Sequence, residues 1–104
     1  MPQPPVLTPE QREQALAKAA EARRARAELK ERLKMGALSL SSLLAKADAD
    51  DHVGKMKVLA VIEALPGVGK VKARRTMDEI GIADTRRVRG LGDQQRTKLL
   101  EVFS

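Results

Sequence analysis

Cysteine, tryptophan and tyrosine are absent from this 104-residue sequence, which has one histidine, His52, and one phenylalanine, Phe103. The lack of cysteine excludes disulfide bonds and thiolate zinc sites, and a lone histidine does not supply an imidazole metal centre. Proteins that hold single-stranded nucleic acid stack its bases on aromatic side chains, so a base-stacking mode is disfavoured as well. We therefore expect neither a metal nor another cofactor.

Long hydrophobic runs are missing too. The first residues, MPQPPVL, have no positive region followed by an apolar one, and no window reaches the roughly 18 apolar residues of a membrane span. The sequence also lacks a Ser/His/Asp set, paired carboxylates and metal-ligand spacing. These absences predict a cytoplasmic protein that is not an enzyme.

Positive charge is what the sequence has in excess. Twenty Lys and Arg residues against 14 Asp and Glu give a net charge of +6 and an isoelectric point near 10.1. Residues 9–34 hold eight basic and five acidic residues, residues 35–54 one and three, and residues 55–104 eleven and six. The positive potential therefore lies at the two ends of the chain, and the excess favours a polyanionic partner.

The chain divides into a flexible, proline-rich N-terminus at residues 1–8, a long N-terminal helix at residues 9–35 and a small helical core at residues 36–104. Thr8 and Gln11 predict a capping box at the start of the long helix, and Gly36 ends it. Leu29 and Leu33, one helical turn apart, would anchor only its C-terminal end. We expect the N-terminal half to project from the core.

The sequence ARRAR lies in the middle of the long helix and has two interpretations. Its arginines either form a solvated face or contact phosphate. The residues concerned are Arg23, Arg24 and Arg26, with Glu21, Glu28 and Glu31 as the ion-pair partners on a solvated face.

Four further helices are predicted in the core, so the expected fold class is all-α. We place them at about residues 40–47, 55–65, 69–80 and 94–103, with Ser39 and Asp93 as N-caps of the first and last. The stretch DADDHVG, residues 48–54, is interpreted as a polar break in which His52 is an exposed loop residue. Gly81 should end the helix at 69–80, with Ile82 as the apolar residue that follows a glycine C-cap.

The stretch PGVG connects two of these helices and carries the main chemical signal. Pro66 cannot continue the preceding helix, Gly67 and Gly69 permit backbone angles closed to other residues, and Val68 can fill the gap between the helices. This pattern predicts a helix-hairpin-helix turn. The unpaired N–H groups and the positive dipole end of the next helix would attract an anion such as phosphate.

The charge around this turn favours a binding role over a tight corner that binds nothing. Six cations flank it: Lys55, Lys57, Lys70, Lys72, Arg74 and Arg75. A P-loop would need glycine at Ala64 and Ser or Thr at Val71, and a dinucleotide fingerprint would need glycine at Lys72, so neither pattern fits.

The hairpin recurs when the sequence is shifted by 23 positions. Residues 67–69 then fall on residues 90–92, Met77 on Leu100 and Ile80 on Phe103. The second turn has Arg89 and Asp93 in place of a proline and a lysine, but the arginines before it restore the positive field. We expect two similar turns.

Three long blocks resemble the actinobacterial integration host factor family: GKMKVLAVIEALPGVGKVKA, RRVRGLG and ARRARAELKERLK. The resemblance extends over nearly all of the chain from about Leu7. It implies a nucleoid-associated monomer in which a long helix precedes an S13-like helix-two-turns-helix core, unlike the dimeric HU-type proteins. It further implies that residues 36–104 are a DNA-binding core that binds duplex DNA with little sequence preference and bends or loops it.

The candidate DNA contacts are the first turn, its cations and the arginines before the second turn. They are Lys55, Lys57, Pro66, Gly67, Val68, Gly69, Lys70, Val71, Lys72, Arg74, Arg86, Arg87 and Arg89. Phosphate contacts of this kind position a protein without reading bases. Two alternatives stay open: a structured-RNA or ribosomal-RNA-binding protein, which an S13-like core would also serve, and an adaptor whose N-terminal helix docks on another protein.

Overall fold

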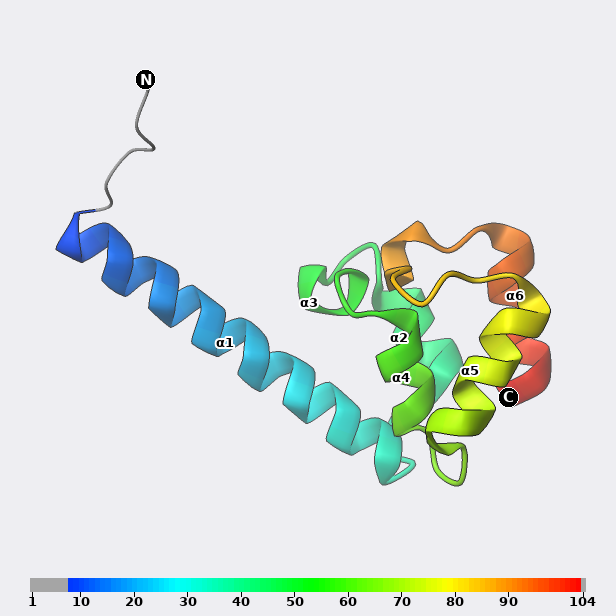
Figure 1. Ribbon diagram of the computed structural model, residues 1–104. Helices are drawn as coiled ribbons and strands as arrows, with labels where there is room; N and C mark the ends of the chain where they lie inside the picture. Colours follow the sequence, from blue (N-terminus) through cyan, green and yellow to red (C-terminus); the bar gives the residue numbers. More distant parts are fainter. Residues whose placement is uncertain (1–7, 104) are drawn as a thin grey trace, which may run out of the picture.

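The computed structural model describes residues 8–103, which form helices joined by short turns (Figure 1). The elements are α1 (Pro9–Lys34), α2 (Leu40–Lys46), α3 (Asp51–Gly54), α4 (Val58–Ala64), α5 (Gly69–Ile80), the 3₁₀-helix η1 (Val88–Gly90) and α6 (Asp93–Phe103). No β-strand occurs within residues 8–103, and the expected all-α class is confirmed. The flexible segment expected at residues 1–8 lies outside the described residues except for Thr8.

Helix α1 has the local signals and the projecting course that the sequence predicts. The Thr8 hydroxyl accepts a hydrogen bond from the Gln11 N–H at 3.1 Å, and the Gln11 side chain accepts one from the Thr8 N–H at 3.0 Å. Leu33 is fully buried and Leu29 half-buried, whereas the first half of the helix stands clear of the core (Figure 1). The radius of gyration, 16.2 Å, accordingly exceeds the roughly 13 Å typical of a compact chain of this length.

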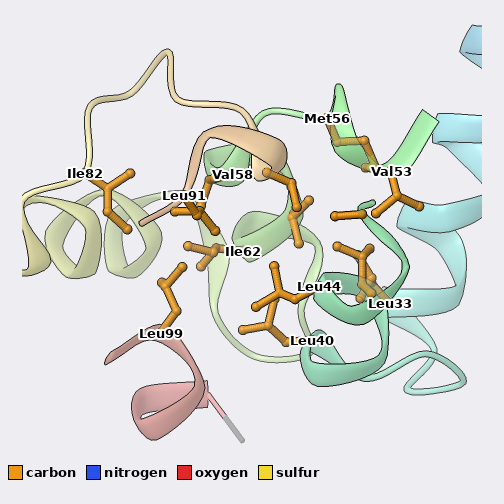
Figure 2. Close-up of a cluster of buried hydrophobic side chains, with 14 of the residues drawn as sticks. Leu33, Leu40, Leu44, Val53, Met56, Val58, Ile62, Ile82, Leu91 and Leu99 are labelled. Atoms are coloured by element: carbon orange, nitrogen blue, oxygen red, sulfur yellow. The ribbon is translucent and has the colours of Figure 1, made fainter. Parts of the chain in front are cut away.

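One hydrophobic core joins the end of α1 to all the later elements (Figure 2). Every helix contributes at least one side chain that is almost or entirely removed from solvent. The largest fully buried side chains are Leu33, Leu43, Val53, Met56, Val58, Val61, Ile62, Met77, Val88 and Leu99. This shared core fixes α1, the turn before α5 and the segment before η1 relative to one another.

Two helices of the core begin and end where their caps predict. The Ser39 hydroxyl accepts a hydrogen bond from the Ser42 N–H at 3.1 Å at the start of α2. Helix α5 ends at Gly81, whose φ of +87° is readily adopted by glycine. The Ile82 N–H donates a hydrogen bond to the Met77 carbonyl at 2.8 Å. Ile82 is buried as expected.

The polar break expected at residues 48–54 is wrong, because its second half is the single-turn helix α3. The Asp50 carboxylate accepts a hydrogen bond from the His52 N–H at 2.9 Å and so caps this turn. Val53 is fully buried, and His52 is half-buried on the helix rather than exposed in a loop. Val53 is the one large apolar residue beside three aspartates and a histidine, which is too weak a pattern to predict this helix.

The predicted helix at residues 55–65 is wrong at its start. Lys55 ends α3, and α4 begins only at Val58. Lys57 has an extended backbone, with φ −70° and ψ 135°, because it forms an isolated antiparallel bridge with Arg87. A partner so distant in sequence leaves no local signal.

The second turn does not repeat the first. Within residues 8–103 the glycines of positive φ are Gly36, Gly67, Gly69 and Gly81, so those at 90 and 92 adopt other angles. Asp93 was expected to cap α6 but is its first helical residue. Gly92 holds the cap position, since its carbonyl accepts from the Arg96 N–H at 2.9 Å and its N–H donates to the Gln95 side chain at 3.0 Å.

Candidate nucleic-acid interface

The turn between α4 and α5 has the geometry predicted for an anion-binding hairpin. Gly67 and Gly69 have φ angles of +75° and +70°, and apart from the adjoining backbone no atom of the described residues would lie within 4 Å of a Cβ on either. Val68 is half-buried against the core, and its N–H donates to the Leu65 carbonyl at 3.3 Å. The turn, residues 65–69, is therefore anchored from inside while its two glycines and Pro66 stay exposed; we call it the glycine turn.

The N-terminus of α5 is open to solvent. Within the described part of the chain, no side chain forms a capping hydrogen bond there, unlike at α1 and α2. The first N–H groups of a helix have no partner inside it, and they carry the positive end of its dipole. Lys70, Val71 and Lys72 in the first turn of α5 are all exposed, Val71 at 74%. An anion can approach these backbone donors between two lysines.

The segment before η1 lies beside the segment before α4. The Val58 N–H donates to the Arg86 carbonyl and the Val88 N–H to the Met56 carbonyl, both at 2.9 Å. These bonds enclose the Lys57–Arg87 bridge and bring two candidate residues from distant parts of the sequence together.

The three arginines before the second turn are held in different ways. Arg87 donates a side-chain hydrogen bond to the Lys55 carbonyl, and Arg86 donates to the Gly90 carbonyl at 3.2 Å. Arg89 donates to the Asp51 carboxylate at 2.7 Å in an ion pair that is partly exposed. The hydrogen bond and charge of Arg89 lower the pKa of the Asp51 carboxyl. Arg89 thus stabilises the fold, and its charge is partly neutralised by Asp51.

Gly54 makes room for Arg89, a requirement that sequence reasoning missed. A Cβ at Gly54 would lie 2.8 Å from the Ala47 carbonyl oxygen and 2.9 Å from Nε and Nη2 of Arg89. Only a residue without a side chain lets the guanidinium lie across this backbone. The sequence carries no local signal for such a contact, because Gly54 lies inside a helical turn.

A cleft of about 340 Å³ lies between α1 and the core. Its cations come from α1, from the segment before α4 and from the segment before η1: Arg23, Arg26, Lys30, Lys57 and Arg87. We call it the basic cleft. Within residues 8–103 the one ion pair is that of Arg89 with Asp51, so the α1 arginines are not paired with Glu21, Glu28 or Glu31 as a solvated face would have them.

The basic cleft and the glycine turn lie on the same side of the molecule. A second hollow, of about 250 Å³, has Gly69 and Lys70 on one wall, and Lys30 borders both hollows. The structure thus brings Lys57, Lys70 and Arg87 together with α1. Lys72 and Arg75 instead border a separate hollow with Glu79 and Val102, and Arg74 is exposed on α5.

This basic, all-helical protein, with an open helix start behind a glycine turn, is a helix-two-turns-helix protein by fold, as a family match shows. Residues 33–103 match the family described as the S13-like H2TH domain. The chain belongs to the integration host factor family, which confirms the resemblance seen in the sequence. It is 63% identical over 99 residues to the integration host factor of Mycobacterium tuberculosis, covering 95% of this chain and 94% of that protein.

Two further relatives extend the comparison. The integration host factor of Streptomyces coelicolor is 54% identical over 99 residues, covering 95% of this chain and 92% of that protein. A solved structure described as sIHF bound to an 8bp palindromic DNA superimposes with a TM-score of 0.82 at 50% identity. The match covers 85% of this chain and 99% of that one.

Proposed function

We propose that this protein binds duplex DNA mainly through its phosphates, with little sequence preference, and bends or loops it as an architectural protein of the nucleoid. The observation that carries the proposal is the open N-terminus of α5 behind the glycine turn, on the same side as the cations of the basic cleft. The DNA-bound relative of the same fold supports the choice of DNA as the polyanion.

The first contact is a phosphate held at the glycine turn. The Val68 N–H is bonded to the Leu65 carbonyl, but the N–H groups of Gly69, Lys70 and Val71 begin α5, where backbone donors without a partner in the helix and the dipole both favour negative charge. Pro66 and Val68 shape the turn, and Lys70 and Lys72 add full charges on either side. Since both glycines lack a Cβ, a phosphate oxygen can reach the main chain directly.

The second contact is made by Lys55, Lys57, Arg86 and Arg87, which lie on the two paired segments before α4 and before η1. Arg87 retains further N–H donors after bonding to the Lys55 carbonyl, and both it and Arg86 are exposed for a phosphate or the minor groove. Arg89 supports this contact through its bond to Asp51. Arg74 supplements the field from α5.

Bending follows if one rigid body holds a duplex at two separated points. The cost of a substantial bend is roughly 1 to 6 kcal/mol by elastic estimates, which a few charge-assisted contacts offset. Adenine is read by Asn or Gln in bidentate geometry, and neither proposed contact includes such a residue. The side chain of Gln95, on α6, is bonded to the backbone of Gly92 and Gly81 and lies outside both contacts. Binding should therefore be broad, and bound protein should change the supercoiling that a closed circular DNA keeps after relaxation by a topoisomerase.

A cytoplasmic, nucleoid location follows from DNA as the partner. None of the helices in residues 8–103 is long and apolar enough to cross a membrane. We expect the protein to act as a monomer in solution, because one chain carries both contacts.

An amide-resolved titration tests the proposal. Adding a short mixed-sequence duplex to ¹⁵N-labelled protein should shift the amides of the glycine turn and of residues 86–88, and leave those of α6 in place. If the duplex saturates the protein while the Gly67 and Gly69 signals stay still, the proposed phosphate site is wrong. A structured RNA of equal length, competed at equal salt, tests the alternative partner that an S13-like core favours.

A further inference from the structure

We propose that the basic cleft binds a compact polyphosphate, such as the phosphate chain of a nucleoside triphosphate, at a site separate from the glycine turn. Its volume of about 340 Å³ lies at the lower end of the range for small-ligand pockets, roughly 300 to 1,000 Å³. Five of its eight lining residues are Lys or Arg, and the remainder are Ala27, Met56 and Ala60.

The sign of the charge separates this cleft from other hollows of the molecule. Three further hollows that border lysine or arginine each include a carboxylate: Asp93 with Glu101, Glu79, and Glu63. The lining of the basic cleft contains none, and no ion pair within residues 8–103 neutralises its cations. Five cations exceed the charge of about −2 that one phosphate carries, so a chain of phosphates suits the cleft better.

Both walls of the cleft are fixed by the core. Leu33 and Leu29 anchor the α1 wall that carries Arg23, Arg26 and Lys30. The opposite wall is held by the Lys57–Arg87 bridge and by the hydrogen bond from Arg87 to the Lys55 carbonyl. Cations on two anchored elements lose less conformational entropy on binding than cations on a flexible chain.

The basic cleft shares residues with a proposed DNA contact, so binding at the cleft should affect the binding of DNA. Lys57 and Arg87 belong to the basic cleft and also to the second proposed DNA contact, so a bound polyphosphate competes with the duplex. Only this competition rests on the proposed function, since the binding of polyphosphate to the protein alone does not depend on DNA.

The test is calorimetry and ¹⁵N NMR on the full chain without DNA, with sodium tripolyphosphate, ATP and orthophosphate as probes. We expect saturable one-to-one binding of tripolyphosphate and ATP, with amide shifts at residues 23–30, Lys57, Ala60 and Arg87. Orthophosphate should bind at least about tenfold more weakly, because it forms fewer charge-assisted hydrogen bonds. Shifts confined to the glycine turn, or scattered over the surface without saturation, would overturn the proposal.

Neighbouring arginines on α1 give a matched pair of variants. Arg23 lines the cleft, whereas Arg24 is exposed on the same helix and does not border it. Arg23→Gln should weaken tripolyphosphate binding by about tenfold, the loss of one charge-assisted hydrogen bond, and Arg24→Gln should leave it nearly unchanged. Equal losses in the two variants would mean diffuse attraction and no site.

Competition is measured separately, by displacement of a labelled duplex. Tripolyphosphate should displace the duplex from wild type at lower concentration than from Arg23→Gln. A protein that binds tripolyphosphate in the cleft but not the duplex would contradict the proposed function and leave this site intact; the converse result would remove the site alone.

Discussion

Lys57 and Arg87 are partners in an antiparallel bridge, although one precedes α4 and the other precedes η1. Directly opposed residues of such a bridge place their side chains on the same face, and like charges there repel each other. The fold therefore holds two cations side by side at the wall of one cleft. An anion bound between them would relieve this repulsion, which is why the bridge marks a binding surface better than the net charge does.

Removing these two charges should change the salt dependence of DNA binding. The binding constant falls with salt, and each phosphate contact adds about 0.9 to the steepness of log K against log salt. The double variant Lys57→Gln, Arg87→Gln should therefore make this slope shallower by roughly 1.8. Fluorescence anisotropy at several salt concentrations measures it. The charge-matched control, Lys46→Gln with Lys98→Gln, lies on α2 and α6 and should keep the wild-type slope. Equal slopes in all three proteins would exclude the second contact.

The glycine turn should respond to a single Cβ. Gly69→Ala places alanine at a φ of +70°, at a cost of roughly 1 to 2 kcal/mol, and should weaken DNA binding because the N–H groups of the turn shift. Gly36→Ala, at a φ of +76° after α1, is the matched control. Urea denaturation should show similar losses of stability for both, while anisotropy shows a loss of DNA affinity only for Gly69→Ala. A Gly69→Ala protein with wild-type affinity would contradict the backbone contact.

The attachment of α1 depends on Leu33. Leu33→Ala should lower the free energy of unfolding by about 2 to 5 kcal/mol, because the side chain is fully buried at the end of the helix. Leu16→Ala, on the projecting half and 61% exposed, should change it by less than about 0.5 kcal/mol. Urea denaturation compares the two. A large loss for Leu16→Ala would mean that the projecting half is packed in solution.

Acid should weaken the bond between Asp51 and Arg89. The pKa of the Asp51 carboxyl is lowered from its usual 3.8 by the hydrogen bond and charge of Arg89, so the carboxylate stabilises the fold above that pH and loses this effect as pH falls through the lowered value. Wild-type protein should therefore lose stability more steeply below about pH 4 than Arg89→Gln, which lacks the partner. The midpoints of urea denaturation at several pH values measure the difference. Parallel curves for the two proteins would show that the pair does not form in solution.

Local signals predicted the parts of the structure that depend on neighbours in sequence. Thr8, Ser39 and Gly81 fix helix ends through hydrogen bonds to residues within a few positions. The starts of α1 and α2 and the end of α5 could therefore be predicted from the sequence. The glycine turn belongs to the same group, since its angles follow from Gly67 and Gly69.

Other expectations were wrong where a residue distant in the sequence determined the structure, or where the sequence pattern was weak. The similarity between the two glycine pairs is real in sequence, but Gly90 is the last residue of the 3₁₀-helix η1, and neither Gly90 nor Gly92 has a positive φ. Leu100 and Phe103 do pack against the core as the repeat predicts, although the fully buried residue of α6 is Leu99.

The sequence by itself determined an all-helical, basic protein with a phosphate-type turn, because helix caps, glycine angles and charge are local or additive properties. Only the tertiary structure decided that Arg23 and Arg26 share a cleft with Lys57 and Arg87, and that Arg89 is held by Asp51. These pairings depend on how the end of α1 packs on the core and on the bridge before η1. Long-range packing of this kind is set by the combined shape of many buried side chains, which no short stretch of sequence contains.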